Sequence, residues 1–262
     1  MKILALMSSF LKQGNTAHIV LLIEQQMAEI AARHDEPLDF DTLALAHLDI
    51  EVCRGCRTCF DRGEGKCPLK DDVPAIRAKI DAADGIILAS PVYVDDVNAV
   101  AKNWIDRMAY VCHRPAFGGK CATLIATVGE GPTRHTLRTM NFALRSWGFH
   151  IVGRAGYKMG ALMTQAEAAH HFQDEAGDIA ETLFQAIAQQ QYLRPSFISL
   201  MIFRVQQHAW RKVSAPDSYD YAYWKTQGWF ELDCTFYIEH QAHPVKVALA
   251  RLVGAALAPF VT

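Results

Sequence analysis

Four cysteines within fifteen residues form the group of side chains best suited to chemistry in this chain. Cys53, Cys56, Cys59 and Cys67 give the pattern C-x2-C-x2-C-x7-C-P. Two-residue gaps allow successive thiolates to turn inward on one short loop, and bacterial ferredoxins hold iron–sulfur clusters with the related pattern C-x2-C-x2-C-x3-C-P. Since the sequence contains no second quartet, we expect these four cysteines to bind one [4Fe–4S] cluster.

Two other uses of the four cysteines remain open. Four thiolates can bind Zn²⁺, although this spacing is less usual for a zinc site. The thiols can also stay without a metal, either reduced or joined in disulfides. A disulfide framework is not indicated, because the chain is long, shows no export signal and has its other cysteines scattered at Cys112, Cys121 and Cys234. Metal or redox chemistry is therefore the first hypothesis.

The composition is that of an ordinary globular protein. Hydrophobic residues make up 51% and charged residues 21% of the 262 residues, values that argue against global disorder. The formal net charge of -2 gives no electrostatic basis for binding nucleic acid. No apolar run reaches the roughly 18 residues that a membrane-spanning helix needs. We therefore expect a cytoplasmic protein with no nucleic-acid partner and no transmembrane segment.

Short apolar runs alternate with helical periodicity and predict the elements that position a site. Buried parallel strands are expected at the apolar runs Lys2–Met7, Gly85–Ala89, Cys121–Val128 and, more weakly, Ile151–Ala155. Between them, apolar residues recur at helical spacing in the ranges 19–30 and 97–108. A repeated strand–helix order predicts an α/β fold with a doubly wound parallel sheet.

Ligands of such sheets bind beyond the carboxyl ends of the strands, so the loops after Met7, Ser90 and Thr127 form the candidate site. The first loop carries hydroxyls and a glycine into a helix N-terminus, which favours an anion. The alternative is a capped helix start, with Asn15 or Thr16 as the cap and no ligand. In the second loop an aromatic side chain can border a flat ligand, and in the third loop glycines allow a close backbone approach.

Three segments together resemble the NADPH-dependent FMN reductase group of flavodoxin-like proteins. They are Ser8-Ser9 with Gly14-Asn15-Thr16, Ala89-Ser90-Pro91-Val92-Tyr93, and Lys102-Asn103-Trp104-Ile105-Asp106-Arg107. The resemblance covers about residues 1–190, and the cysteine segment narrows it to the iron–sulfur flavoproteins. It implies a flavodoxin-like sheet with strand order 2-1-3-4-5. The family usually opens its first loop with a glycine between serines, whereas this chain has Ser8-Ser9-Phe10 followed by Lys12, so the phosphate site is a variant one.

The resemblance also implies a cofactor, FMN, and the residues that bind it. The phosphate is expected at Ser9, Lys12, Gly14, Asn15 and Thr16. The ring system is expected against Pro91, Val92, Tyr93, Val94, Val128, Gly129 and Gly131. In the family the flavin accepts a hydride from NAD(P)H and passes electrons to a second substrate, so the redox chemistry belongs to the cofactor and no catalytic base is required.

The last part of the chain, residues 191–262, differs in character from the rest and is expected to form an extension that is partly helical. It holds 13 of the 26 aromatic residues, in segments too short to form a core one by one. We expect it to pack on the α/β domain (1–190) or on a sister subunit near the flavin, forming an acceptor pocket or a dimer clamp. The alternative is a membrane-surface helix over Val245–Thr262, with Lys246 and Arg251 as its basic edge.

The sequence thus predicts an FMN-dependent NAD(P)H oxidoreductase that passes electrons to an unidentified small-molecule or protein acceptor, through a [4Fe–4S] cluster if the quartet binds one. We also expect a homo-oligomer. Two alternatives remain open. The first is a flavin and iron–sulfur electron carrier or redox sensor without catalytic turnover, and the second is a zinc-stabilised binding module without flavin.

Overall fold

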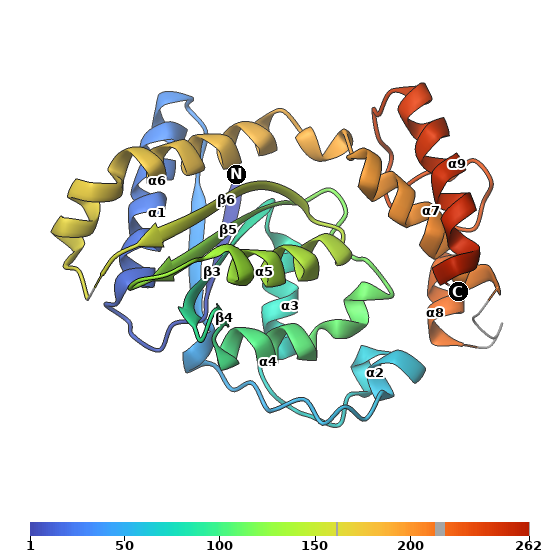
Figure 1. Ribbon diagram of the computed structural model, residues 1–262, viewed down its shortest axis with the longest axis horizontal. Coiled ribbons are helices and arrows are strands. Elements are labelled where there is room, and N and C mark those ends of the chain that lie inside the picture. Colours follow the sequence, from blue (N-terminus) through green and yellow to red (C-terminus); the bar gives the residue numbers. More distant parts are fainter. Residues whose placement is uncertain (161, 213–217, 262) are drawn as a thin grey trace.

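Five parallel strands form the centre of the structure, a computed structural model that describes residues 1–160, 162–212 and 218–261. The strand order is β2-β1-β3-β5-β6, and the short β4 pairs antiparallel with the end of β3 (Figure 1). The strands are β1 (Lys2–Met7), β2 (Asp39–Ala44), β3 (Gly85–Tyr93), β4 (Asp96–Val97), β5 (Cys121–Val128) and β6 (His150–Lys158). With β4 set aside, this is the expected order 2-1-3-4-5, so the predicted flavodoxin-like fold is confirmed.

Burial explains which strands the sequence revealed. All eight residues of β5 are buried, and β1 is buried from its second residue onward, so both appear as continuous apolar runs. The edge strand β2 is only half-buried, and its sequence DFDTLA contains two aspartates. It therefore lacks the apolar run of a central strand, and the sequence analysis did not locate it. The third strand extends to Tyr93, so Pro91, Val92 and Tyr93 end a strand rather than occupy a loop.

Helices cover both faces of the sheet. On one face lie α1 (Asn15–Arg33) and α6 (Gln165–Ala188), and on the other lie α3 (Val73–Ala82), α4 (Ala99–Arg107) and α5 (Arg134–Ser146) (Figure 1). Trp104 and Trp147 are fully buried in the second layer, with their ring centroids 5.2 Å apart. Both side chains belong to the hydrophobic core of this layer. Short helical turns complete this part at η1 (Leu45–His47), α2 (Thr58–Asp61), η2 (Glu64–Lys66) and η3 (Ala109–Cys112).

In the last part of the chain, three helices of the described residues lie beside the sheet domain (Figure 1). After the turn η4 (Gln191–Leu193) come α7 (Phe197–Lys212), α8 (Tyr219–Thr226) and α9 (Pro244–Val261). Segments too short for a core one by one together enclose one, built around Phe203, Trp224 and Trp229. None of the helices in the described ranges is long and apolar enough to cross a membrane. The boundary at residue 190 as a domain border stays a prediction.

Candidate functional site

The three loops expected to form a site are tied together at the carboxyl edge of the central strands. The amide of Ser8 donates to the carbonyl of Ala89 at 3.0 Å, and the side-chain amide of Asn98 donates to the carbonyl of Ser8 at 2.7 Å. The buried hydroxyls of Thr16 and Thr127 share a hydrogen bond of 2.7 Å. The ends of β1, β3 and β5 are therefore held in one arrangement by the chain's own hydrogen bonds.

The first loop delivers a helix N-terminus to this edge. Helix α1 begins at Asn15, and the capping position belongs to Gly14, which has no side chain to cap it. The alternative that Asn15 or Thr16 caps this helix is therefore wrong. No acidic residue lies in the first turn, so the positive end of the helix dipole faces the loop without a carboxylate of its own. The Asn15 side-chain oxygen accepts a hydrogen bond of 2.9 Å from the amide of Met163.

The second loop is a tight hairpin between β3 and β4 whose tip is strained. Val94 and Asp95 have φ angles of 50° and 67°, the left-handed region that both central residues of such a two-residue hairpin need. Aspartate tolerates this conformation, but a β-branched residue does not. Val94 is fully exposed and Tyr93 is 53% exposed. The hairpin thus presents two unburied apolar side chains at the candidate site, as expected for Tyr93, and does so against the backbone preference of valine.

The backbone of the third loop takes a course that requires two glycines, Gly129 and Gly131. A Cβ on Gly129 would lie 2.9 Å from the carbonyl oxygen of Gly160, because the two backbones are directly paired. Gly131 has a φ of 104°, a conformation that L side chains rarely adopt. The close backbone approach expected from these glycines is therefore present, although Gly129 makes it to another segment of the chain. Contact of Val128, Gly129 and Gly131 with a ligand stays a prediction.

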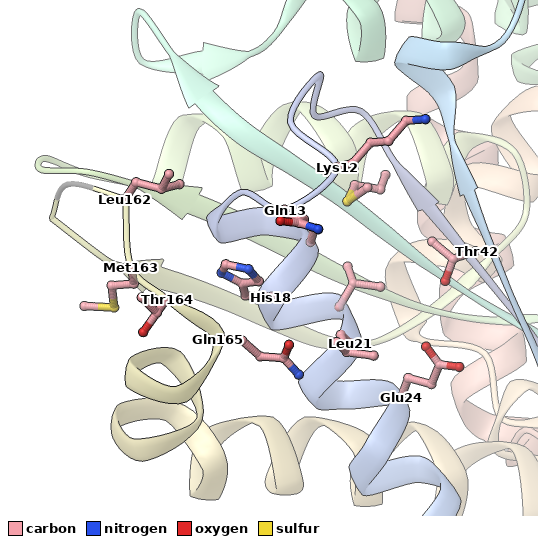
Figure 2. A pocket seen from close by; sticks show the side chains of 13 residues that line it. Lys12, Gln13, His18, Leu21, Glu24, Thr42, Leu162, Met163, Thr164 and Gln165 are labelled. Carbon is pink, nitrogen blue, oxygen red and sulfur yellow. The ribbon is translucent and has the colours of Figure 1, made fainter.

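A groove of about 710 Å³ runs beside the first loop, between α1, the end of β2 and the segment before α6 (Figure 2). Lys12 and Gln13 line it at the loop, and His18 and Glu24 line it along α1. Burial raises the pKa of the Glu24 carboxyl. Of the residues expected to bind the phosphate, Lys12 is the one that lines this groove, and its side chain is exposed.

The four cysteines line one cavity of about 560 Å³ but do not meet at one point. Cys53 and Cys56 are exposed, whereas Cys59 and Cys67 are partly buried. In the described part of the chain, which includes all four cysteines, no three histidine, cysteine or acidic side chains converge closely enough to hold a metal ion. The assignment of a [4Fe–4S] cluster to these four cysteines therefore stays a prediction.

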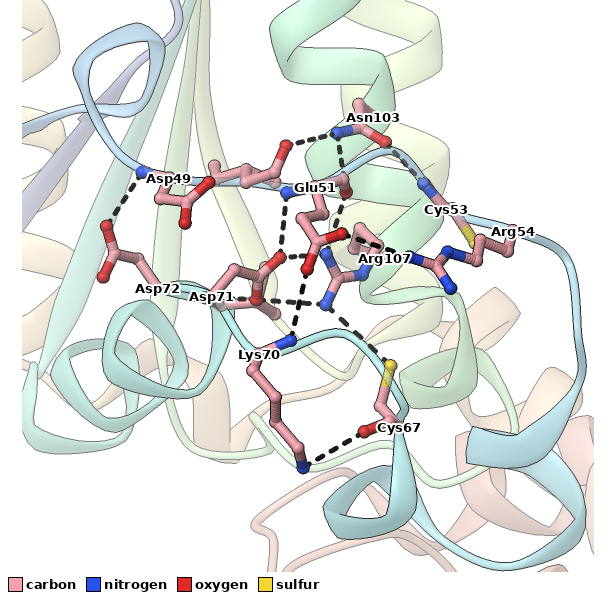
Figure 3. A network of polar contacts seen from close by, with 12 residues as sticks. Asp49, Glu51, Cys53, Arg54, Cys67, Lys70, Asp71, Asp72, Asn103 and Arg107 are labelled. Carbon is pink, nitrogen blue, oxygen red and sulfur yellow. Dashed lines mark hydrogen bonds and ion pairs between the residues drawn. The ribbon is translucent and has the colours of Figure 1, made fainter.

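The start and the end of this cysteine segment are anchored to α4 (Figure 3). The Asn103 side chain accepts from the amide of Cys53 at 3.1 Å and donates to the carbonyls of Ile50 and Glu51. Arg107 donates to Asp71 through both terminal nitrogens and reaches the sulfur of Cys67 at 3.9 Å. Helix α4 starts directly after the hairpin, so the same helix adjoins the flavin-side loops and holds the cysteine segment.

The Arg107–Asp71 pair is almost completely buried, and the hydrogen bonds to Asp71 decide its charge. Burial opposes ionisation, but the hydrogen bonds from Arg107 and from the amides of Glu51 and Val73 outweigh it and hold the pKa of Asp71 below its usual value. The sequence analysis did not predict that Asp71 forms a buried ion pair with Arg107.

A second anchor holds the middle of the segment to the C-terminal helices. Arg114, 2% exposed, donates to the carbonyl of Cys59 at 2.7 Å and pairs with Glu64 and with Asp220 of α8. Asp220 also receives a 2.8 Å hydrogen-bonding contact from His113. The C-terminal part of the chain therefore packs against the cysteine segment. This position differs from the expectation that it would lie beside the flavin loops.

Two of the four thiols have shifted acidities with opposite causes. A hydrogen bond from the Thr58 hydroxyl, assisted by the Thr58 amide, lowers the pKa of Cys56. Burial, with a smaller contribution from the charge of Cys67, raises the pKa of Cys59. The segment therefore presents one exposed thiol that ionises readily and one half-buried thiol that resists ionisation until a partner charge offsets burial.

Sequence reasoning missed the side chains that tie these parts together, namely Asn98, Asn103, Arg107, Arg114 and Asp220. Asn98 had a detectable signal, since an Asn directly before an apolar helical stretch is a common helix cap, and its side chain accepts from the amide of Ala101. Asn103 and Arg107 belong to a segment on which the family resemblance was based. Arg114 and Asp220 are 106 residues apart, and no local pattern connects them.

Comparisons with known proteins agree with this architecture. The sequence profile of the NADPH-dependent FMN reductase family matches residues 1–161. An iron–sulfur flavoprotein of Archaeoglobus fulgidus is 26% identical over 229 residues, which cover 87% of this chain and 99% of that protein. An iron–sulfur flavoprotein of Methanocaldococcus jannaschii is 39% identical over 107 residues, 41% of this chain and 51% of its own length.

Two solved structures share the fold. RosB, crystallised with a bound formylriboflavin phosphate intermediate, superposes with a TM-score of 0.58 at 14% identity over 73% of this chain and 80% of its own. A flavone reductase superposes with a TM-score of 0.54 at 15% identity, over 73% of this chain and 64% of its own. At these identities the similarity shows the fold alone.

Proposed function

The chain belongs to the NADPH-dependent FMN reductase family, and from this membership we propose that it is an FMN-dependent NAD(P)H oxidoreductase that delivers electrons to a small-molecule or protein acceptor. The observation that carries the proposal is the joining of three loops at one sheet edge, around a helix N-terminus capped only by glycine. A dianionic phosphate is favoured at such a helix end by the backbone amides and the helix dipole.

The residues at this edge fit FMN. The phosphate would be held by Ser9, Lys12, Gly14, Asn15 and Thr16. Tyr93 and Val94 would border the ring system from the hairpin, where their apolar surface is uncovered. The flavin supplies hydride acceptance and single-electron release when bound, while the chain orients it and excludes water from one of its faces.

The donor chemistry of the cysteine segment fits a [4Fe–4S] cluster. Four thiols line one cavity, and the guanidinium of Arg107 reaches the sulfur of Cys67 at 3.9 Å, so it would hydrogen-bond a ligating thiolate there. The segment is anchored through Asn103 and Arg107 to α4, the helix that follows the hairpin, so one helix would join a cluster there to the proposed flavin loops. This arrangement suits acceptors that take electrons one at a time.

We further propose that the protein assembles with copies of itself through α9. The exposed side chains of this helix are apolar and recur at helical spacing, with Leu252 at 69% and Phe260 at 87% exposure. Its two charged residues point inward, since Lys246 donates to the carbonyl of Pro195 and Arg251 donates to those of Cys234 and Leu232. A membrane-surface helix keeps a charged face in water, so this uncharged exposed stripe favours a protein partner.

The experiment that tests the oxidoreductase proposal is the visible spectrum of anaerobically purified protein, combined with assays of flavin, iron and acid-labile sulfide. We expect stoichiometric FMN, and rapid bleaching of its absorbance on addition of NADPH or NADH. Bleaching by dithionite alone would contradict the enzyme and favour an electron carrier or sensor. A colourless protein with stoichiometric zinc would contradict both and favour a zinc-stabilised binding module.

A further inference from the structure

A cavity of about 500 Å³ lies between α5, the start of β6 and α7, and the proposed function does not use it. We refer to it as the α5–α7 cavity. It opens near His150, the first residue of β6, and so lies at the amino edge of the sheet. The loops proposed for FMN lie at the opposite, carboxyl edge. A ligand in this cavity would therefore occupy a site separate from the flavin.

The walls of the α5–α7 cavity are mainly apolar and aromatic. Phe142, Phe149 and Tyr192 line it from the sheet domain and the turn that follows α6, while Ile198 and Ile202 line it from α7. Phe142 is 74% exposed and Ile198 is 50% exposed, so large apolar surfaces face water at this site. A flat apolar body bound between them would remove that surface from water, which is the main source of affinity in pockets of this size.

The charged groups of the cavity have one sign. Among its described lining residues there is no aspartate or glutamate, whereas Arg145 lines it together with His150 and His113, of which His113 already contacts Asp220. Arg145 has no ion pair within the described ranges, and its hydrogen bond to the Ser196 hydroxyl is long, at 3.4 Å. Burial, together with the charge of Arg154, lowers the pKa of Arg145, and burial with the charge of Arg145 lowers that of His150. An anion would relieve both effects.

The other polar side chains of the cavity differ in whether they already have hydrogen-bond partners in the protein. Gln206 donates to the carbonyl of Cys112 and accepts from Tyr237, and the Ser146 hydroxyl contacts the carbonyl of Ala143 and the thiol of Cys112. By contrast, the side-chain oxygen of Asn141 is buried and has no partner in the described part of the chain. A half-turn of this amide would present its NH₂ group instead. The cavity therefore offers a guanidinium and an amide that are not fully used.

We propose that the α5–α7 cavity binds a small aromatic carboxylate. The carboxylate pairs with the guanidinium of Arg145, whose planar fork matches two oxygens. The ring lies between Phe142, Phe149 and the isoleucines of α7. The one-sided charge of the cavity selects an anion, and its aromatic walls select a flat body over a sugar or a free phosphate.

Isothermal titration of the full-length protein with 2-naphthoate and with 2-naphthamide tests this assignment, because the two probes have almost the same shape and differ in charge. We expect naphthoate to bind about tenfold or more tightly than naphthamide, the effect of a hydrogen bond to a charged group. Arg145→Gln should reduce naphthoate affinity to that of naphthamide. Arg138→Gln is the matched control, since Arg138 is an exposed residue of the same helix and does not line the cavity.

Ile202→Ala removes part of the apolar wall and should weaken both probes several-fold while leaving the preference for naphthoate. If Arg145→Gln does not fold, Arg145→Lys takes its place, and it should keep a reduced preference because the charge remains while the fork is lost. Equal binding of the two probes, no binding of either at millimolar concentration, or a preference that survives Arg145→Gln would each overturn the assignment. None of these results depends on flavin content, so the outcome is independent of the oxidoreductase proposal.

Discussion

The loops at the carboxyl edge of the sheet and the cysteine segment differ in how their geometry is fixed. The loops follow buried strands and are joined to one another by hydrogen bonds such as that between Thr16 and Thr127. The cysteine segment is mostly irregular, with two of its thiols exposed, and it is held by side chains from outside, chiefly Asn103, Arg107 and Arg114. The first region is therefore organised before a ligand arrives, whereas the second is irregular and is positioned by side chains of other elements.

This difference predicts that the fold itself organises the proposed FMN site, whereas a bound metal centre would order the cysteine segment. A preformed site loses little entropy on binding, so FMN affinity should depend on individual contacts. An irregular segment that binds a metal centre through four thiolates gains order from that centre, so the loss of one thiolate should affect the whole segment. The following predictions test this contrast, in order of decreasing effect.

The largest effect is expected when one thiol of the quartet is removed. Cys59→Ser should abolish the cluster or leave it too labile to purify, because all four ligands are required. FMN content should stay unchanged, since the flavin loops do not depend on the segment. Acid-labile sulfide and FMN are measured in the same anaerobic preparation. Cys112→Ser is the control, and an intact cluster in Cys59→Ser would contradict the four-ligand assignment.

The next largest effect is expected when the buried Arg107–Asp71 ion pair is broken. Asp71→Asn leaves the guanidinium of Arg107 buried without its counter-charge, and we expect a loss of about 3–5 kcal/mol in the free energy of unfolding. Asp72→Asn, which affects only an exposed contact with the amide of Asp49, should cost much less. Urea unfolding of the cofactor-free proteins measures both. Equal losses in the two variants would show that the Arg107–Asp71 pair does not hold the segment.

The same pair predicts a pH dependence. The folded state lowers the pKa of Asp71, so its contribution to stability is complete above the unfolded-state value of about 3.9 and is lost as the pH falls through the lower folded-state value. The difference in stability between the unmodified protein and Asp71→Asn should therefore shrink as the pH is lowered below about 4. A difference that stays constant down to pH 3 would contradict this linkage.

An intermediate effect is expected at the flavin phosphate. Truncating both Asn15 and Thr16 to alanine should weaken FMN binding by roughly 2–3 kcal/mol, taking about 1–1.5 kcal/mol for each hydrogen bond to a charged group. Thr127→Val separates the two possible causes, because it breaks the bond to Thr16 without removing a group from the phosphate loop. Fluorescence titration with FMN gives the affinities. If Thr127→Val weakens binding as much as the double variant does, the loop tie matters and the phosphate contacts do not.

The sequence predicted the buried strands and the loops that follow them better than it predicted how the cysteine segment is held. The central strands were predictable because burial on both faces leaves continuous apolar runs, as in Cys121–Val128, whereas their order was implied by the family resemblance. The half-buried edge strand Asp39–Ala44 was not, since its aspartates interrupt the pattern. The spacing of the cysteines was evident from the sequence, but the side chains that anchor the cysteine segment were not. Arg114 meets Asp220 across 106 residues, and such a contact depends on tertiary packing that local patterns do not contain.

The smallest effect is expected at the hairpin tip, where the preformed edge contains strain. Val94 holds a φ of 50° although a β-branched residue in this region costs about 1–2 kcal/mol. Val94→Gly removes that cost at an entropic penalty of about 0.5–1 kcal/mol, so the free energy of unfolding should rise by up to about 1.5 kcal/mol. FMN affinity should fall at the same time, because the exposed valine is proposed to border the ring.

Asp95→Gly is the control, with a smaller gain in the free energy of unfolding expected because aspartate tolerates the left-handed region. Urea unfolding and FMN titration measure the two effects. A less stable variant would show that Val94 is not strained, and an unchanged FMN affinity would show that Val94 does not contact the flavin.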